Sequence, residues 1–92
     1  MNYNYKAIIY GKRLWEKSGR FKGVLCVVKK FYIKIDMVNW VRKEINMPNT
    51  MPTYVQFFIR KNHVWEPTLK CQVKVPVNKQ RKRTLIWGDQ RV

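Results

Sequence analysis

Side chains that bind phosphate by charge dominate the chemistry available to this sequence. There are 20 Lys and Arg against 5 Asp and Glu, so the formal net charge of the 92 residues is +15. Each cation that meets a phosphate releases condensed counterions, so such a surface attracts polyanions. The sharpest local signal is the basic segment 79–83, whose four cations are Lys79, Arg81, Lys82 and Arg83. This pattern is typical of an arm that wraps a phosphate backbone, although a solvated loop without a partner has the same composition.

A second basic group surrounds the turn of the first predicted hairpin, close to Trp15. Its members are Lys12, Arg13, Lys17, Arg20 and Lys22. A basic hairpin tip can enter a groove of nucleic acid, where an aromatic residue acts as a wedge or as a stacking ring. Trp15 is therefore a candidate for stacking, and a place in the core is the alternative.

Strand alternation predicts a third group, in which cations and rings share one exposed face of a sheet. The cations are Lys30, Lys34, Arg60, Lys70 and Lys74, and the rings are Tyr32, Tyr54 and Phe58. Sheet surfaces hold single strands by placing cations on phosphates beside rings that stack on bases. Stacking contributes about 1–3 kcal/mol per base. The alternative is that these rings pack against each other or beneath a loop.

Residues suited to catalysis are sparse. His63 is the only histidine, and as a general base cutting RNA it would need partners such as Arg60, Lys61 or Tyr54. The five acids are scattered and no glycine-rich phosphate loop occurs. We therefore expect no enzyme, no metal and no cofactor, and keep a toxin-like ribonuclease using His63 as a third hypothesis.

The two cysteines, Cys26 and Cys71, are too few and too far apart for a metal cluster or a disulfide framework. We expect two free and mostly buried thiols, with a disulfide as the alternative.

The stretch from His63 to Val77, which ends Val-Lys-Val-Pro-Val, resembles the strand pair of small HicA-type toxins. The resemblance covers about fifteen residues. It implies a fold like that of double-stranded-RNA-binding domains and cleavage of mRNA by the histidine. The Gly-Ser that precedes the histidine in that family is absent here, and no helix clearly follows the predicted strands.

Hydrophobic periodicity predicts the elements that must position these residues. Residues 3–10 are rich in β-formers, and with a return strand at 20–35 they predict one long hairpin that turns at 16–19. Asp36 is the expected N-cap of a helix that runs to about Met47.

Two alternating strands are expected after the helix, at 54–60 and 69–75. Their apolar residues recur at every second position, which is typical of half-buried strands. A turn at 61–63 joins them, and Pro67 marks an edge or a bulge. A short apolar stretch at 84–87 is a possible fifth strand.

The predicted fold class is α+β: a twisted antiparallel β-sheet in the order β-β-α-β-β, with one helix packed on one face. A chain of 92 residues fits a single domain, here 1–92, and its 46% hydrophobic and 14% aromatic content favours a folded domain over a disordered basic tail. The longest apolar run, 24–28, is far too short to span a membrane, and the N-terminus lacks a signal-peptide pattern. We expect a cytoplasmic protein with no membrane partner.

The cations are concentrated at the two ends of the chain. Residues 1–35 carry nine Lys and Arg with one acid, residues 36–66 carry four with three, and residues 67–92 carry seven with one. If the two basic regions lie side by side in one sheet, their exposed faces merge into one cationic surface. A helix on the opposite face would leave that surface open.

The main functional hypothesis is a non-catalytic protein that binds RNA or DNA through its phosphate backbone. The alternative is a small phage-type inhibitor or adaptor from a mobile element, such as an anti-defence or anti-CRISPR protein. Its partner would be a nucleoprotein complex or an acidic protein surface. The sequence leaves open the kind of nucleic acid, the strandedness and the oligomeric state.

Overall fold

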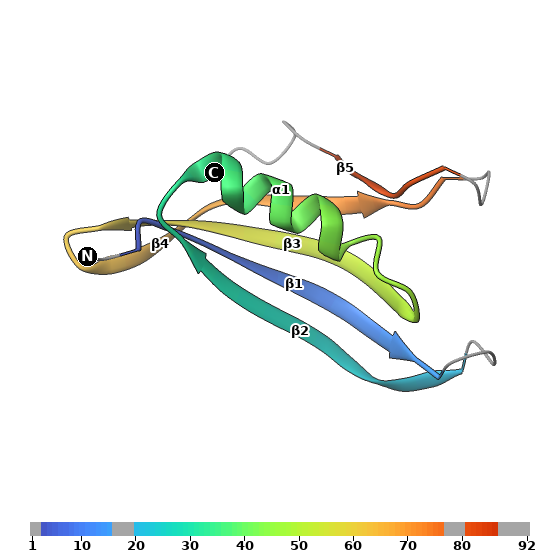
Figure 1. The fold of residues 1–92 in the computed structure, drawn as a ribbon. Coiled ribbons are helices and arrows are strands. Elements are labelled where there is room, and N and C mark those ends of the chain that lie inside the picture. The colour runs from blue at the N-terminus through green and yellow to red at the C-terminus, as the bar shows by residue number, and fades with distance from the viewer. Residues whose placement is uncertain (1–2, 16–19, 77–80, 87–92) are drawn as a thin grey trace.

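The sheet of this protein has five antiparallel strands in the order β2-β1-β3-β4-β5. The computed structural model describes residues 3–15, 20–76 and 81–86. Its elements are β1 (Tyr5–Leu14), β2 (Phe21–Phe31), α1 (Lys34–Glu44), β3 (Thr50–Lys61), β4 (Val64–Lys74) and β5 (Thr84–Ile86). One helix stands between β2 and β3 in the chain (Figure 1). The predicted α+β class, the element order and the fifth strand are confirmed.

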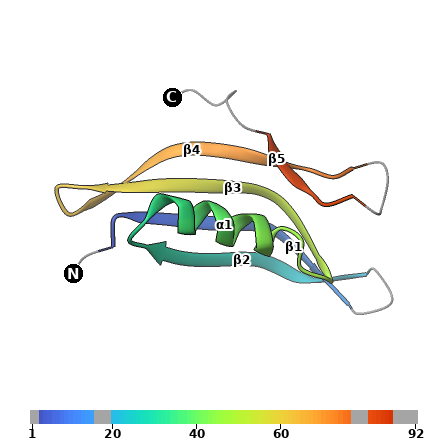
Figure 2. The ribbon, with the colours of Figure 1, turned by 45° about the horizontal axis from the view of Figure 1, so that its top comes forward.

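The helix covers one face of the sheet, as predicted, and the core lies between the two (Figure 2). From α1 and the residue after it, Met37, Val41 and Ile45 enter this core. They pack with the sheet residues Ala7, Ile9, Leu25, Phe31, Val55, Phe57, Cys71 and Leu85. In the part of the chain that the structure describes, no element covers the opposite face, which is called the open face below.

The boundary between β2 and α1 differs from the prediction. The last pair of the β1–β2 ladder joins Tyr5 to Phe31, and Phe31 is buried with its ring 5.5 Å from that of Trp40. Beyond Phe31 the chain has no partner in β1, so the strand ends there rather than at residue 35. The helix then begins at Lys34, with Asp36 in its first turn rather than at its N-cap. An acid in the first turn favours the helix dipole, which explains the helix-start signal at this residue.

Two irregularities in the sheet each leave one threonine without a cross-strand partner. Between β1 and β3 the register shifts after Tyr10, and Thr53 is the additional residue. Between β3 and β4 it shifts after Phe57, and Thr68, next to Pro67, is the additional residue. Thr53 Oγ1 donates to the carbonyl oxygen of Tyr10 at 3.1 Å, and Thr68 Oγ1 donates to that of Phe57 at 3.2 Å. The bulge predicted at Pro67 is therefore confirmed, and it changes which side chains face the helix.

The turn between β3 and β4 is a tight two-residue connection. Lys61 pairs with Val64, and the residues between them, Asn62 and His63, have φ of 50° and 65°. Two successive positive φ values are typical of a type I′ turn, which suits the right-handed twist of a hairpin. The turn predicted at 61–63 is confirmed.

Candidate nucleic-acid interface

The open face collects six of the described cations. Because side chains alternate along a strand, the cross-strand register determines which residues share this face. Lys6 stands opposite both Lys30 and Phe58, and Arg60 stands opposite Trp65. The same alternation gives the full set of Lys6, Lys12, Lys30, Arg60, Lys70 and Lys74. The first and last thirds of the chain thus contribute to one surface, with β1 and β3 at its centre (Figure 1).

Four aromatic rings of β1, β3 and β4 lie among these cations and hold several of them in place. The rings are those of Tyr10, Tyr54, Phe58 and Trp65. Tyr10 and Tyr54 stack with centroids 4.6 Å apart, and Lys70 Nζ lies 4.2 Å from the centroid of Tyr54. Lys6 Nζ lies 4.4 Å from the centroid of Phe58. Contacts of this kind contribute about 0.5–1 kcal/mol at exposed sites, so the ammonium groups are held over the sheet without being neutralised.

The described carboxylates lie away from the open face. Asp36 and Glu44 belong to α1, and Glu66 stands opposite Ile59 on the side of the sheet that the helix covers. The cations of the open face therefore repel one another without a described acid between them. Burial, and then the charge of Lys30, lowers the pKa of the Lys6 ammonium. Burial, followed by Cys26 and Tyr54, raises the pKa of the Tyr10 hydroxyl.

The predicted face is only partly the observed one. The structure brings together Lys30, Arg60, Lys70, Lys74, Tyr54 and Phe58, as the alternation predicted. Two predicted members are elsewhere because β2 ends early: Tyr32 lies after the strand and Lys34 lies in α1. Tyr32 stacks on Tyr3 with centroids 4.3 Å apart, and the hydrogen bond with Tyr3 raises its pKa. The placement of Tyr32 and Lys34 on the sheet face was therefore wrong.

The residues of the predicted hairpin tip divide between the two faces. Lys12 lies on the open face opposite Met51, while Arg13 stands opposite Thr50 on the helix side. Trp15 is 53% exposed and Lys22 Nζ lies 4.9 Å from its ring, so Trp15 is not part of the core. The backbone oxygen of Arg20 accepts a hydrogen bond from Trp15 N at 2.8 Å. Lys17 lies outside the described residues.

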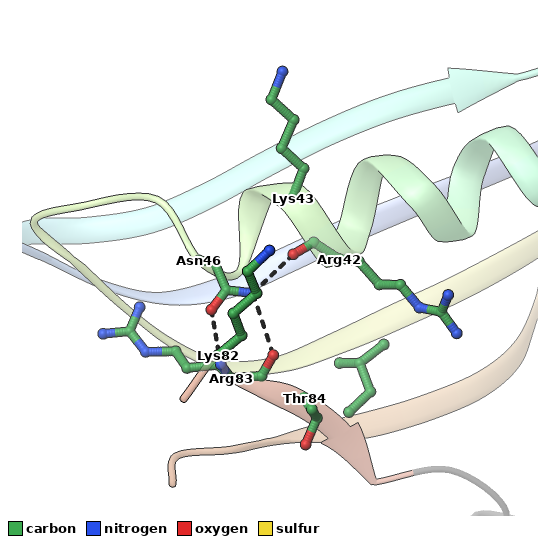
Figure 3. Close-up of a pocket in the computed structure, with 7 residues that line it drawn as sticks. Arg42, Lys43, Asn46, Lys82, Arg83 and Thr84 are labelled. Carbon is green, nitrogen blue, oxygen red and sulfur yellow. Dashed lines mark hydrogen bonds between the residues drawn. The ribbon is translucent and has the colours of Figure 1, made fainter. Parts of the chain in front are cut away.

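The described part of the basic segment, residues 81–83, approaches the helix rather than the open face. Lys79 lies outside the described residues, and Arg81 and Lys82 are exposed. Arg83 is half-buried, and its Nη1 donates to the carbonyl oxygen of Ile45, just after α1, at 3.0 Å. Figure 3 shows Asn46 between the end of α1 and this segment. Arg83, predicted to contact phosphate, is thus engaged in docking its own segment onto the helix.

A groove of about 700 Å³ lies where this segment meets α1. It is lined by Arg42, Lys43, Asn46, Lys82, Arg83, Thr84 and Leu85 (Figure 3). Arg42 and Lys43 stand in the last turn of α1, where cations favour the helix dipole. The groove is a second basic surface, on the helix side of the molecule.

Sequence reasoning missed three members of the open face: Lys6, Tyr10 and Trp65. Strand alternation was a sufficient signal for Lys6 and Tyr10, which interleave with the buried Ala7 and Ile9. Trp65 gave a misleading signal, because unbroken alternation would put it on the same side as Leu69, facing the helix. The additional residue at the second bulge, Thr68, reverses that parity and turns Trp65 to the open face.

Among the described residues, the groups considered for catalysis or metal binding do not form a metal site. His63 is exposed in the β3–β4 turn, and no set of three or more His, Cys, Asp or Glu among the described residues could hold a metal ion. Cys26 and Cys71 are both free, but only Cys71 is buried, so the expected burial of Cys26 was wrong. Within the described residues, no helix has the length and apolar character needed to cross a membrane.

We compared the chain with protein-family models, with curated proteins and with solved structures, and found no match in any of the three. The resemblance of residues 63–77 to toxins gains no support from these comparisons, and β4 is followed by β5 in the described chain.

Proposed function

We propose that this protein binds nucleic acid through the open face of its sheet, without catalysing a reaction. The observation that carries the proposal is the composition of that face: six cations with four rings among them and none of the described carboxylates. A surface of one charge sign that spans several strands attracts a polyanion and guides its approach. Phosphates are the groups that such a surface binds best.

The contacts within the face favour binding to the backbone over reading of bases. Lys70 covers one side of the Tyr54 ring, and Lys6 covers one side of the Phe58 ring. Cations in these positions contact the phosphates of an approaching strand. A base can stack on one of these rings only where the other side of the ring is accessible. Stacking of bases on Tyr54 or Phe58 therefore stays a prediction of secondary importance. Binding through the backbone implies strong dependence on salt and weak dependence on sequence.

Two neighbouring lysines provide a matched test of the face. Lys30 lies on the open face opposite Lys6, whereas Lys29 stands opposite the buried Ala7 on the helix side. Lys30→Gln and Lys29→Gln therefore remove the same charge from adjacent, exposed positions. Affinity for single-stranded RNA, single-stranded DNA and duplex DNA is measured for each variant over a range of salt concentrations.

We expect Lys30→Gln to weaken binding and to reduce the salt slope by about 0.9 on duplex DNA or about 0.7 on a single strand. Lys29→Gln is expected to leave the slope close to that of the wild type. Substitution of Lys70 and of Lys74 by glutamine extends the test across the sheet. Equal effects of Lys29→Gln and Lys30→Gln would show that net charge, rather than this face, determines binding.

A second candidate function, an inhibitor or adaptor that docks on a nucleoprotein or acidic protein, is favoured by one observation. At the β2 edge of the open face, the outer strand presents an apolar row to solvent: Phe21, Val24 and Val28 are 60%, 73% and 51% exposed. A protein partner would bury such residues, whereas a phosphate backbone would not. Loss of all nucleic-acid binding at physiological salt, together with recovery of one nuclease-resistant protein partner, would favour this function. We propose the cytoplasm as the location for either function.

A further inference from the structure

One end of the open face places two lysines directly opposite each other. Lys6 in β1 and Lys30 in β2 are cross-strand partners. Like charges in this arrangement destabilise a sheet. The repulsion is reflected in the lowered pKa of Lys6, for which burial is the larger cause and Lys30 the second. No described carboxylate shares the face to relieve it. The arrangement is unfavourable for folding, which points to a ligand that supplies the missing negative charge.

A third cation and an indole ring complete the group. Around the ring centroid of Trp65 lie Lys6 Nζ at 4.9 Å, Lys30 Nζ at 5.9 Å and Arg60 Cζ at 5.9 Å. These four residues are called the Trp65 cluster. Its cations come from three different strands and converge on one ring, although nothing in their sequence spacing links them.

The backbone around the cluster is held by specific contacts. Arg60 and Trp65 are direct cross-strand partners next to the tight turn of the β3–β4 hairpin. Asn4 connects the neighbouring strands: its N–H donates to Phe31 O at 3.0 Å, and its carbonyl oxygen accepts from Arg60 N at 2.9 Å. Lys6 and Arg60 are half-buried, so their side chains have lost part of their freedom before any ligand arrives. The entropic cost of gathering three cations around an anion is correspondingly lower.

We propose that the Trp65 cluster is a subsite for one phosphate group of a nucleic-acid strand. Lys6 and Lys30 supply point charges, and Arg60 supplies a planar pair of donors that matches two phosphate oxygens. The inference rests on the proposed function for the source of the phosphate. The subsite itself requires only the anion, so the two can fail separately.

The phosphate can be a terminal monoester or an internal diester, and both present the same non-bridging oxygens to the cluster. A monoester carries close to two negative charges at neutral pH, and a diester carries one. Oligonucleotides of one sequence with a 5′-phosphate, with a 3′-phosphate and with neither separate these sources.

The first experiment uses inorganic phosphate alone. We expect it to shift the indole N–H resonance of Trp65 with saturation, while chloride at equal ionic strength does not. Lys30→Gln, at an exposed position, is expected to weaken the affinity for phosphate in this titration about tenfold. The reason is that the variant loses one charged hydrogen bond to the anion. Lys70→Gln, on the same face but outside the cluster, serves as the control and is expected to leave this affinity unchanged. An equal response to chloride, or an unchanged response in Lys30→Gln, would overturn the subsite.

The second experiment measures oligonucleotide affinity for the same variants, with Lys6→Arg as a charge-preserving companion to Lys6→Gln. A terminal-phosphate site loses affinity in Lys6→Gln only for a phosphorylated strand, and an internal-phosphate site loses it for all three strands. Either result supports the cluster if the loss of affinity in Lys6→Gln is larger than the loss in Lys70→Gln. Equal losses of affinity in Lys6→Gln and Lys70→Gln contradict it. Saturation by inorganic phosphate without oligonucleotide binding would reject the proposed function and leave the subsite. Oligonucleotide binding without a response to inorganic phosphate would support the proposed function and overturn the subsite.

Discussion

The side-chain amide of Asn46 pairs with the backbone of Arg83 in both directions. Asn46 Oδ1 accepts from Arg83 N at 2.7 Å, and Asn46 Nδ2 donates to Arg83 O at 3.2 Å and to Arg42 O at 2.9 Å. One side chain thus makes the two hydrogen bonds that a neighbouring strand would make. It connects the end of α1 to the start of β5, which has only three residue pairs with β4.

Replacement of Asn46 by alanine is expected to loosen β5. The half-buried N–H and carbonyl of Arg83 lose their partner, so the free energy of unfolding falls by about 1–3 kcal/mol. Amide exchange at Leu85 accelerates more than exchange at Val55 in the centre of the sheet. Asn39→Ala, at an exposed position of α1, is the control and is expected to be neutral or slightly stabilising. Equal losses in the two variants would show that the bridge to Arg83 contributes nothing.

Gly11 and Gly23 provide a second matched pair. A Cβ at Gly11 would lie 2.3 Å from Met51 O and 2.6 Å from Pro52 Cα, both backbone atoms at the β1–β3 bulge. A Cβ at Gly23 would meet nothing within 4 Å. We expect Gly11→Ala to lower the free energy of unfolding by at least about 1–3 kcal/mol, as overpacking does. Gly23→Ala is expected to be neutral or to raise it by up to about 1 kcal/mol. Urea midpoints measure both, and a tolerated Gly11→Ala would show that β3 can move away at the bulge.

His63 occupies a turn position that glycine fills better. Its φ of 65° is left-handed, a conformation that costs a residue with a Cβ about 1–2 kcal/mol. We expect His63→Gly to raise the free energy of unfolding by up to about 1 kcal/mol, because the greater freedom of glycine in the unfolded chain offsets part of the gain. Asn62→Gly is the comparison, with a smaller gain since asparagine tolerates this region. If the wild type cleaves RNA and His63→Gly does not, the ribonuclease hypothesis replaces the binding one.

The two thiols differ in exposure, and this difference reports on the open face. Cys26 is exposed and stands opposite Tyr10 on that face, whereas Cys71 is 0% exposed. A thiol reagent at pH 8 is expected to modify Cys26 and to leave Cys71 intact in the native protein. Nucleic acid bound as proposed slows the modification of Cys26, and labelling in denaturant verifies that both thiols can react. An unchanged rate at Cys26 in the complex would place the nucleic acid elsewhere.

Burial of Cys71 also makes stability depend on pH. Burial raises the pKa of this thiol from 9.0 to about 11. The folded state therefore holds the proton more tightly than the unfolded state. The resulting stability is fully present below pH 9 and is lost as pH rises through 11. The difference in unfolding free energy between the wild type and Cys71→Ala is expected to narrow over this interval. A constant difference from pH 8 to pH 11 would show that Cys71 ionises as easily when folded.

The sequence was sufficient for the fold because its strands alternate cleanly. Every second residue in 69–75 is apolar, and the side chains of this set that lie in β4, Leu69, Cys71 and Val73, do face the helix. The end of β2 was harder to predict, because Ile33 and Ile35 continue the apolar alternation past Phe31. The strand stops where the partner strand β1 begins, at Tyr5, and that limit is a property of the pairing rather than of the residues themselves.

The candidate site was less predictable than the fold. Lys30 and Lys70 could be assigned from alternation alone, because no bulge separates them from their buried neighbours. Trp65 could not be assigned, because the additional residue at Thr68 reverses its orientation and leaves no clear trace in composition. The role of Arg83 was equally hidden: a run of cations predicts phosphate contacts, and only the tertiary structure shows its donation to Ile45 O.

The outer strand β2 carries Lys22, Lys29 and Lys30. Lysines on an outer strand hinder pairing with the same strand of another copy, and the net charge of +15 adds repulsion between whole molecules. A polyanion that binds the open face neutralises part of this positive charge and so reduces the repulsion between copies. Complexes close to charge balance will therefore be the least soluble form of the protein, and an excess of either component will return them to solution.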